Sequence, residues 1–218
     1  MRTEATLNVS EIFYSIQGES RHAGYPCLFI RLHGCNLRCS YCDARYTYDE
    51  PGREMTVAAV MQEVQKTPGA MVEVTGGEPL LQEGVYPLFD ALLADHRTVL
   101  LETNGSVDIS RVPAAVIRIM DLKCPGSNMH QQMLPANLAL LRPEDEIKFV
   151  LSSRQDYDWA REMIHAHGLA EIAHLSCSPV IGSLAPAELA QWLMQDRLPC
   201  RLQLQLHTIL WPGQKRGV

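Results

Sequence analysis

Three cysteines close together in the sequence are the residues best placed to do chemistry. They are spaced as Cys35-x3-Cys39-x2-Cys42 within the run RLHGCNLRCSYCDARYTY. Three thiolates on one loop can bind three corners of a cubane iron-sulfur cluster, whereas an ordinary cluster of that type takes four cysteine ligands. One iron is then left without a protein thiolate. An iron of this kind can chelate a small molecule through an amine and a carboxylate, so the loop predicts a reactive site as well as an electron store.

Two other interpretations of the cysteine loop remain open. Zinc takes four ligands, and His33 could join the three thiolates in a Cys3His site. A disulfide is disfavoured, because seven cysteines are an odd number and the N-terminal sequence does not resemble a secretory leader. The other cysteines stand singly among apolar or Pro-flanked residues and are expected to be small buried hydrophobes: Cys27, Cys124, Cys177 and Cys200.

Composition and charge narrow the class of protein. The chain has 218 residues, 46% of them hydrophobic, which suits one domain spanning 1–218. The formal net charge of −6 argues against a general attraction to nucleic acid or to anionic membranes. No apolar run approaches the roughly 20 residues needed to cross a bilayer. We therefore expect a cytoplasmic protein, in a compartment that keeps thiols reduced, whose partner is a small molecule.

Short apolar runs alternate with amphipathic stretches along the chain, which is typical of β/α units around a parallel sheet. The apolar runs predict strands over 27–34, 71–76, 97–105, 115–123, 146–153 and 170–178, with an alternating final strand over 201–210. Helical periodicity predicts helices over 56–67, 79–96, 154–168 and 186–196, the first capped by Thr56. Six such units are too few for a closed eight-stranded barrel. The predicted fold is therefore α/β, an open, partial TIM-like barrel of (β/α)6 type.

Polar and glycine-rich segments follow the first four predicted strands. The cysteine loop follows the first, GGEP (76–79) the second, ETNG (102–105) the third and KCPGS (123–127) the fourth. In barrels of this class the reactive groups stand on the loops after the C-terminal ends of the strands. We expect these four segments to converge on one face and to form one active site.

Residues within these segments have both a chemical and a structural interpretation. The glycines of GGEP would leave backbone N–H and C=O groups open to an extended ligand. Glu102 either accepts hydrogen bonds from ribose hydroxyls or is a solvated carboxylate at a strand end. Asp121 and Lys123 form either a buried charge pair or a ligand contact.

Both ends of the chain add candidates. Gly18 and its neighbours in SIQGES (15–20) offer backbone groups suited to the edge of a planar heterocycle. Arg31 lies on an apolar strand, where it must face an anion, and its planar fork suits a carboxylate. His207, on the predicted final strand, is by default a hydrogen-bonded histidine of the core or one that supports a residue of the site, and KRGV (215–218) a frayed end.

The cysteine spacing, with Tyr41 just before the third cysteine, resembles that of the radical S-adenosylmethionine (SAM) superfamily. GGEP resembles the segment that binds the methionine amino group of SAM in that superfamily. A narrower resemblance rests on SIQGES, FIRLHGCNLRCSYCDARYTY, TGGEP, LETNG, DLKCPGS and QLHTILW…KRGV. Together, from about residue 11 to the last residue, these segments resemble the 7-carboxy-7-deazaguanine synthases.

This resemblance implies a homodimer of partial barrels with a 4Fe-4S cluster, SAM and an external electron donor such as flavodoxin. It implies a lyase that converts 6-carboxy-5,6,7,8-tetrahydropterin into 7-carboxy-7-deazaguanine with loss of ammonia, in 7-deazapurine and queuosine biosynthesis. No catalytic side chain is certain, since the radical comes from the cofactor. Two alternatives are a glycyl-radical-enzyme activase of the same superfamily and a non-catalytic zinc-binding protein.

The resemblance also assigns residues to ligands. The positions that contact the pterin are Ile16, Gln17, Gly18, Arg31, Thr75 and the carboxylate of Val218, and we add His207 to this group. The positions that contact SAM are Tyr41, Cys42, Asp43, Gly77, Asp121, Leu122, Lys123, Ser178 and Pro179, to which we add Glu102.

One position departs from the family pattern. The resemblance implies a Mg²⁺ ion held by a hydroxyl two residues after the third cysteine, where this chain has Ala44. Mg²⁺ demands near-octahedral oxygen ligation and usually keeps several waters. We expect water or the neighbouring Asp43 to replace the missing ligand, with substrate oxygens completing the shell and with weaker binding.

Overall fold

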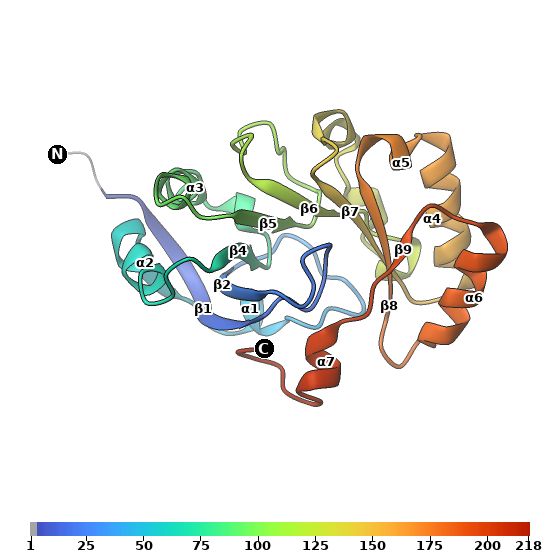
Figure 1. Ribbon diagram of the computed structural model, residues 1–218, viewed down its shortest axis with the longest axis horizontal. Helices are drawn as coiled ribbons and strands as arrows, with labels where there is room; N and C mark the ends of the chain where they lie inside the picture. The colour runs from blue at the N-terminus through green and yellow to red at the C-terminus, as the bar shows by residue number, and fades with distance from the viewer. Residues whose placement is uncertain (1–3) are drawn as a thin grey trace.

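Nine strands form one sheet in the part of the chain that the structure, a computed structural model, describes, which is residues 4–218. Their order across the sheet is β3-β1-β2-β4-β5-β6-β7-β8-β9 (Figure 1). Because β3 and β9 lie at the two edges, the sheet stays open and forms a partial barrel. Residues 1–3 of the predicted domain 1–218 lie outside the described residues.

The central strands are parallel and match the six predicted ones. β2 pairs with β4, and the parallel pairing continues through β5, β6 and β7 to β8. Most of their side chains are buried, as expected for a parallel sheet that is covered on both faces. The predicted open α/β partial barrel is confirmed. Its strands are β2 (Pro26–Leu32), β4 (Met71–Gly76), β5 (Val99–Thr103), β6 (Ile117–Asp121), β7 (Glu146–Leu151) and β8 (His174–Pro179).

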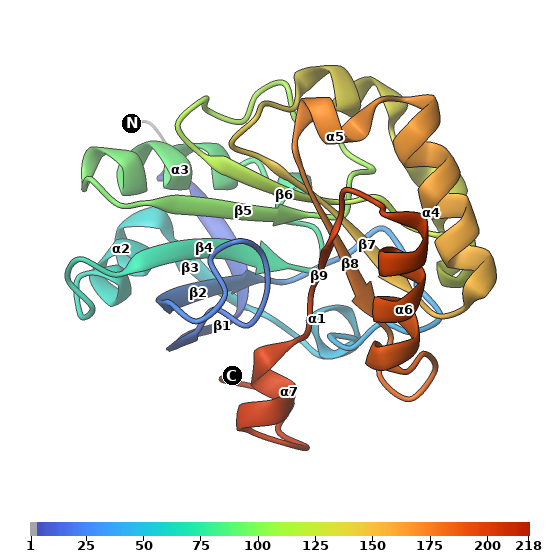
Figure 2. The ribbon, with the colours of Figure 1, turned by 45° about the vertical axis from the view of Figure 1, so that its right-hand side comes forward.

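The predicted helices are present and pack around the outside of the sheet (Figures 1 and 2). They are α2 (Val57–Val64), α3 (Val85–Ala94), α4 (Arg154–Ala166) and α6 (Pro186–Asp196). Thr56 caps α2 as predicted, because its hydroxyl accepts a hydrogen bond of 3.1 Å from the Ala59 N–H. In α3 the buried residues recur three or four positions apart, which gives the apolar stripe that faces the core: Val85, Leu88, Phe89 and Leu92.

Two of the units lack an α-helix in their crossover connection. The connection from β5 to β6 has no helix, and the one from β6 to β7 contains only the 3-10 segments η2 (Pro125–Ser127), η3 (His130–Gln132) and η4 (Pro135–Leu140). Proline opens two of these short segments, where its missing N–H costs nothing. On this side the sheet is therefore flanked by loops and 3-10 segments instead of α-helices.

Two strands near the N-terminus were not predicted, so 27–34 is not the first strand. β1 (Thr6–Ile16) pairs antiparallel with both β2 and β3 (Arg53–Thr56). The register of β1 shifts between Val9 and Glu11. Such a bulge breaks the two-residue alternation by which a strand is recognised in a sequence. β1 extends the sheet beyond β2 and places Glu11 beside it.

The C-terminal prediction is wrong beyond residue 202. β9 (Arg201–Leu202) is two residues long, and Leu206–Leu210 form the helix α7 instead of a strand. The Leu206 N–H donates to the Gly18 carbonyl (3.0 Å), which takes this segment out of the sheet and against the N-terminal loop. The start of the predicted strand 170–178 is likewise helical, as α5 (Leu169–Ile172).

The four cysteines outside the loop are mostly structural, as predicted. Cys27, Cys124 and Cys177 are buried, and Cys200 is partly buried with its Sγ 2.8 Å from that of Cys177. All seven cysteines are free. Among residues 4–218, no helix combines the length and the apolar character needed to cross a membrane.

Candidate active site

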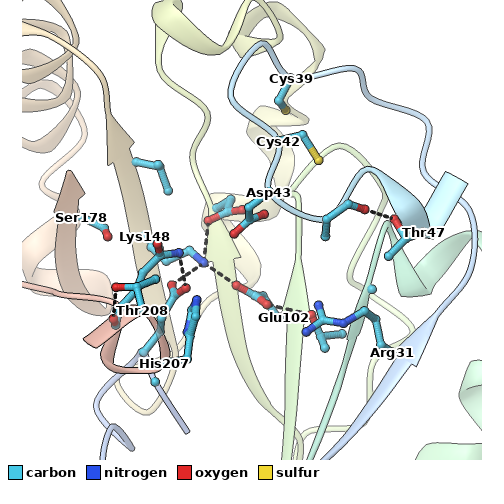
Figure 3. Close-up of a pocket in the computed structure, with 18 of the residues that line it drawn as sticks. Arg31, Cys39, Cys42, Asp43, Thr47, Glu102, Lys148, Ser178, His207 and Thr208 are labelled. Carbon is cyan, nitrogen blue, oxygen red and sulfur yellow. Dashed lines mark hydrogen bonds and ion pairs between the residues drawn. The ribbon is translucent and has the colours of Figure 1, made fainter. Parts of the chain in front are cut away.

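A cavity of about 660 Å³ opens at the C-terminal ends of the parallel strands (Figure 3). The loop after β1, the cysteine loop, the ends of β4 to β8 and the segment from α7 onward form its wall. All but one of the residues expected at the site line this cavity: Ile16, Gln17, Gly18, Arg31, Cys35, Cys39, Tyr41, Cys42, Asp43, Ala44, Thr75, Gly77, Glu102, Asp121, Lys123, Ser178, Pro179, His207 and Val218. The predicted convergence of distant segments is therefore present.

Leu122 is the exception. Its side chain is buried in the apolar core, while its neighbours Asp121 and Lys123 point into the cavity. Successive side chains at the end of a strand face opposite sides, which explains the difference. The SAM contact expected at Leu122 therefore stays a prediction in which its backbone, not its side chain, would take part.

The cysteine loop is held by hydrogen bonds from several directions. The Sγ of Cys35 accepts from the Leu37 N–H (3.4 Å) and lies 3.8 Å from the Asn104 amide nitrogen. Ser40 donates its N–H to the Ser127 carbonyl (3.1 Å). Thiolates that bind iron commonly accept such N–H donors, which tune the cluster. The donor set and its surroundings fit a cluster held by three cysteines.

Burial affects the cysteine thiols before any metal binds. It raises the pKa of Cys35 and of Cys39 above the usual range, and neighbouring donors and Lys123 only partly oppose it. Only thiolates bind metal, so cluster loading must displace these protons.

A Cys3His zinc site is not formed by the structure. His33 is absent from the residues that line the cavity, and its Cβ instead lies close to Gly52. Within the described part of the chain, no three His, Cys, Asp or Glu side chains lie close enough to hold one metal ion. All three thiols line one cavity, where each could hold one iron of a cluster.

The glycines of GGEP allow the backbone after β4 to lie very close to the backbone that leads into the cysteine loop. The Gly77 N–H donates to the Leu32 carbonyl (3.3 Å) and the Glu78 N–H to the Gly34 carbonyl (2.8 Å), so the expectation of open N–H groups here is wrong. A Cβ on Gly77 would lie 2.1 Å from the Gly34 oxygen. Glycine is required because the cysteine loop passes directly over this strand end.

Glu78 joins GGEP to ETNG from a fully buried position. Its carboxylate accepts from the N–H groups of Leu80 (3.0 Å) and Asn104 (2.7 Å) and from the hydroxyl of Thr103 (3.0 Å). Burial raises its pKa to about 7, although these donors oppose the change. Glu78 thus starts η1 (Pro79–Leu81) and positions Asn104, which reaches the cysteine loop.

The anion that faces Arg31 is Glu11. The Arg31 Nε donates to the Glu11 Oε1 at 2.8 Å, and both side chains are 17% exposed. The guanidinium carbon lies 5.6 Å from the centre of the Phe13 ring and 6.0 Å from that of Tyr46. Burial would lower the Arg31 pKa, but Tyr46 and Glu11 hold it above its usual value.

The loop after β1 packs against α7. Gln17 is buried, donates its amide to the Glu73 carboxylate and accepts from the Glu19 N–H (2.9 Å). A Cβ on Gly18 would lie 2.7 Å from the His207 Nδ1, so no side chain fits there. His207 lies on a helix beside the cavity, so its expected place on a strand and in the core is wrong, whereas a supporting role beside the site stays a prediction.

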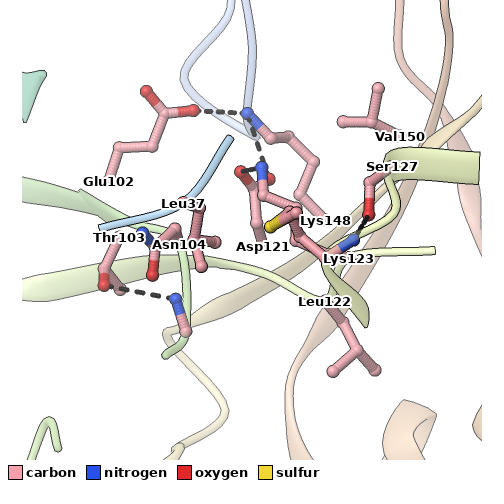
Figure 4. Close-up of polar contacts among 12 residues, drawn as sticks. Leu37, Glu102, Thr103, Asn104, Asp121, Leu122, Lys123, Ser127, Lys148 and Val150 are labelled. Carbon is pink, nitrogen blue, oxygen red and sulfur yellow. Dashed lines mark hydrogen bonds and ion pairs between the residues drawn. The ribbon is translucent and has the colours of Figure 1, made fainter. Parts of the chain in front are cut away.

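A network of buried charges crosses the floor of the cavity (Figure 4). The Lys148 ammonium donates to Glu102 and to Glu19 (3.0 Å) and lies 3.4 Å from the Asp121 Oδ1. Asp121 also pairs with Lys123, so these two residues form a charge pair that lines the cavity. Glu102 is not a free solvated carboxylate, because its other oxygen accepts from the Thr75 hydroxyl (2.7 Å).

The carboxyl groups of the network differ in the direction of their pKa shifts. Burial would raise the pKa of Glu102, but Lys148 and the Thr75 hydroxyl lower it to about 2. Burial would lower the pKa of Lys148, but Asp121, Glu102 and Glu19 hold it well above its usual value. Burial, reinforced by the Glu102 charge, raises the pKa of Glu73 well above its usual range. Opposed pKa shifts of this kind are typical of functional sites.

The region expected to hold Mg²⁺ has one suitable carboxylate. Ala44 contributes no side-chain oxygen, and its carbonyl accepts from the Thr47 hydroxyl of α1 (Tyr46–Asp49) at 2.8 Å. Asp43 is exposed to the cavity, where Figure 3 shows its carboxylate between the cysteines and Lys148. A carboxylate with access to water is a chemically suitable Mg²⁺ ligand.

Several charged residues of the site were not predicted from the sequence. Glu19, Glu73, Lys148 and Lys215 line the cavity, and Glu11 supports Arg31 from behind it. A charge within an apolar strand pointed to Arg31, and the same signal was present in MVEVTG and EIKFV. Glu11 gave no such signal, because the strand that carries it was not predicted.

Comparison with known proteins places the chain among similar sequences and folds. The model of the radical SAM superfamily matches residues 29–168. A 7-carboxy-7-deazaguanine synthase of Chlorobaculum tepidum is 49% identical over 221 residues and covers 100% of both chains. One of Koribacter versatilis is 42% identical over 227 residues, which cover 97% of this chain and 100% of the relative. The crystal structure of QueE from Escherichia coli shares the fold, with a TM-score of 0.75 and 20% identity over 92% of this chain and 94% of that one.

Proposed function

The chain belongs to the 7-carboxy-7-deazaguanine synthase family of the radical SAM superfamily, and we propose that it converts 6-carboxy-5,6,7,8-tetrahydropterin into 7-carboxy-7-deazaguanine with loss of ammonia. This reaction is carried out by a lyase of 7-deazapurine and queuosine biosynthesis. The observation that carries the proposal is that the cysteine loop and the expected pterin contacts Arg31, Thr75 and Val218 line one cavity. The full-length match at 49% identity favours it over the activase and the zinc-binding protein.

The cysteine loop provides the cofactor end of the cavity. Cys35, Cys39 and Cys42 would each hold one iron of a 4Fe-4S cluster, which leaves the fourth iron to the amine and carboxylate of SAM. When bound, these groups supply an electron and a 5′-deoxyadenosyl radical that takes hydrogen from C6 of the pterin. The Tyr41 hydroxyl donates to the Val150 carbonyl (3.1 Å), which fixes the ring beside Cys42.

The opposite end of the cavity would orient the pterin. Arg31 would bind its carboxylate, and the backbone of residues 16–18 would bind the edge of the heterocycle. Together they would hold C6, which carries the carboxylate, toward the cysteine loop. Correct placement of the reacting carbon is where an enzyme gains most in such a step.

Thr75 and Glu102 would form the border between the two ligands. Thr75 is an expected pterin contact, Glu102 an expected acceptor for ribose hydroxyls, and the two are hydrogen-bonded (2.7 Å). The low pKa of Glu102 supports an acceptor role, because the group stays ionised at neutral pH. The Lys148 ammonium, which is paired with Glu102, would keep this carboxylate ionised.

Mg²⁺ is part of the proposal through Asp43. Its carboxylate would supply one protein oxygen, with water and pterin oxygens completing six ligands in place of a hydroxyl at Ala44. With fewer protein ligands, binding should be weaker than in relatives that have a hydroxyl there.

The remaining partners also belong to the proposal. We expect a homodimer, an external electron donor such as flavodoxin and a cytoplasmic location. The last is supported by seven free cysteines, since only a reducing compartment preserves them.

One experiment tests the function directly. The reconstituted protein is incubated anaerobically with dithionite, SAM and 6-carboxytetrahydropterin, and the products are analysed by mass spectrometry. We expect 7-carboxy-7-deazaguanine, ammonia and 5′-deoxyadenosine from brown protein carrying about four irons per chain. Colourless protein with bound zinc, or cluster-loaded protein that cleaves SAM without ever changing the pterin, would reject the proposal.

A further inference from the structure

We propose that Glu11 is a positioning residue that couples the substrate-binding Arg31 to the C-terminal tail, residues 212–218. One side chain would then position both Arg31, which binds the pterin carboxylate, and the tail, which lines the same cavity. The inference rests on the proposed function, because it concerns how that site receives the pterin carboxylate. Glu11 does not line the cavity, whereas Arg31, Tyr46 and Val218 do. It therefore acts through other residues.

The two oxygens of Glu11 bind three groups from distant parts of the chain. Oε1 accepts from the Arg31 Nε (2.8 Å) and from the Tyr46 hydroxyl (2.7 Å). Oε2 accepts from the Gly217 N–H (3.2 Å). β2, α1 and the tail are thus joined at one carboxylate of β1. Hydrogen bonds to a charged acceptor are the stronger kind; those from Arg31 and Tyr46 are partly buried, and the one from Gly217 is exposed.

The ion pair with Glu11 also determines which nitrogens of the Arg31 guanidinium remain available to a ligand. Glu11 binds only Nε, and among residues 4–218 the two terminal nitrogens Nη1 and Nη2 have no hydrogen-bond partner. These nitrogens are the ones that bind a carboxylate at two points. Arg31 lines the cavity and Glu11 does not. Glu11 therefore binds the guanidinium on the side away from the cavity and leaves Nη1 and Nη2 for the substrate.

The tail depends on the same junction. Its other contact, the ion pair of Arg216 with Glu50, is about half exposed on both sides, and exposed pairs contribute little. The Arg216 guanidinium also stacks 4.4 Å from the centre of the Tyr46 ring, whose hydroxyl is bound by Glu11. A short terminal segment loses considerable conformational entropy when it is ordered. The hydrogen bond from the Gly217 N–H to Glu11 is therefore a further anchor that keeps Lys215 and Val218 at the cavity.

The decisive variant is Glu11→Gln in the full-length, cluster-loaded protein. The amide loses the charge and turns an N–H toward a group that itself donates. We expect KM for 6-carboxytetrahydropterin to rise roughly 10- to 100-fold, with iron content and SAM affinity unchanged. The ratio of 5′-deoxyadenosine to product should rise as well, because a misplaced pterin is not attacked. Glu83→Gln is the matched control, since it breaks an exposed pair with Arg111 outside the cavity and should change none of these values.

A second measurement follows the tail without using activity. Carboxypeptidase digestion, read by intact mass, should release Val218 faster from Glu11→Gln than from the wild-type protein or from Glu83→Gln. If the glutamine variant does not fold, Tyr46→Phe removes one hydrogen bond to Glu11 without changing charge and should shift both readouts in the same direction by a smaller factor.

The outcomes are distinct. A higher KM together with faster release of Val218 supports the proposal, and a double variant with Arg31→Lys should then lose less than the sum of the single losses. Unchanged KM and unchanged release overturn it. A higher KM with unchanged release overturns the coupling to the tail. If the wild-type protein does not turn over the pterin, the proposed function fails, while the digestion still tests the anchor.

Discussion

Lys148 and Glu102 form a buried ion pair that crosses the cavity floor from β7 to β5. β6 lies between these strands and adds Asp121, 3.4 Å from the same ammonium. The Lys148 side chain is only 6% exposed, and the structure surrounds it with three carboxylates. Lys148 therefore compensates the negative charge of these carboxylates and holds their side chains together at the floor of the cavity.

Replacing Lys148 with methionine should destabilise the protein strongly. Glu19 and Glu102 would be left close together without this counter-charge, while Asp121 would keep only Lys123, and breaking a buried pair costs about 3–5 kcal/mol. The free energy of unfolding in urea measures the effect. Lys66→Met is the control, because Lys66 forms an exposed pair with Glu63 that contributes little. Equal stability of the two variants would contradict the role of Lys148.

The same ion pair predicts how stability depends on acid. The pKa of Glu102 falls from an ordinary 4.5 to about 2 on folding. A carboxylate with a lowered pKa contributes stability that is fully present above the unfolded pKa and is lost as pH falls through the folded pKa. Glu102→Gln should therefore be less stable than the wild-type protein near neutral pH, by up to about 3 kcal/mol, and the difference should shrink as pH falls from about 4.5 toward 2. Urea unfolding at a series of pH values checks this, and a constant difference would count against it.

Cys39→Ala should lose the cluster and turnover together. With two thiolates left on the loop, a cubane has too few protein ligands to stay bound. Iron content per chain and product formation are the measurements. Cys200→Ala removes a partly buried thiol outside the cavity and should keep both. Full iron loading of Cys39→Ala would show that the loop is not the cluster site.

Residues appended after Val218 should weaken binding of the pterin. They convert the carboxylate of Val218 into a peptide group and remove its charge from the cavity wall. KM should rise by roughly 10-fold or more, as for loss of a charged hydrogen bond, while iron content stays the same. The same tag on the N-terminus is the control. An equally active C-terminally tagged protein would remove Val218 from the pterin site.

The affinity of the enzyme for Mg²⁺ should depend on the side-chain oxygens present at positions 43 and 44. Ala44→Thr adds the missing hydroxyl and should lower the Mg²⁺ concentration that gives half-maximal activity, whereas Asp43→Asn should raise it. Activity is titrated with Mg²⁺ after exhaustive chelation. Should chelation leave activity unchanged and added Mg²⁺ have no effect, metal dependence has been lost in this chain.

The sequence predicted the parts of the molecule whose pattern is local. The parallel strands gave continuous apolar runs, and the loops after them carried cysteines or glycines, so their convergence followed from the topology of a barrel. Arg31 was recognised because a charge in an apolar strand needs a partner, which proved to be Glu11.

What escaped prediction depends on contacts between distant segments. A bulge hid the alternation of β1 and with it Glu11. The alternating run 201–210 became mostly loop and helix, because Leu206 bonds to the Gly18 carbonyl instead of continuing a strand. The side chain of Leu122 turned into the core, which position within a motif alone does not reveal. Each of these outcomes was decided by a neighbour far away in the sequence.

The contact between Gly18 and His207 places a genetic constraint on the two ends of the chain. Even a methyl group at position 18 would lie 2.7 Å from the imidazole Nδ1, so position 18 cannot grow unless the histidine moves or is replaced. A bulkier residue in the first loop would need a smaller one on α7 as its suppressor. Positions 18 and 207, at opposite ends of the chain, are therefore expected to change together.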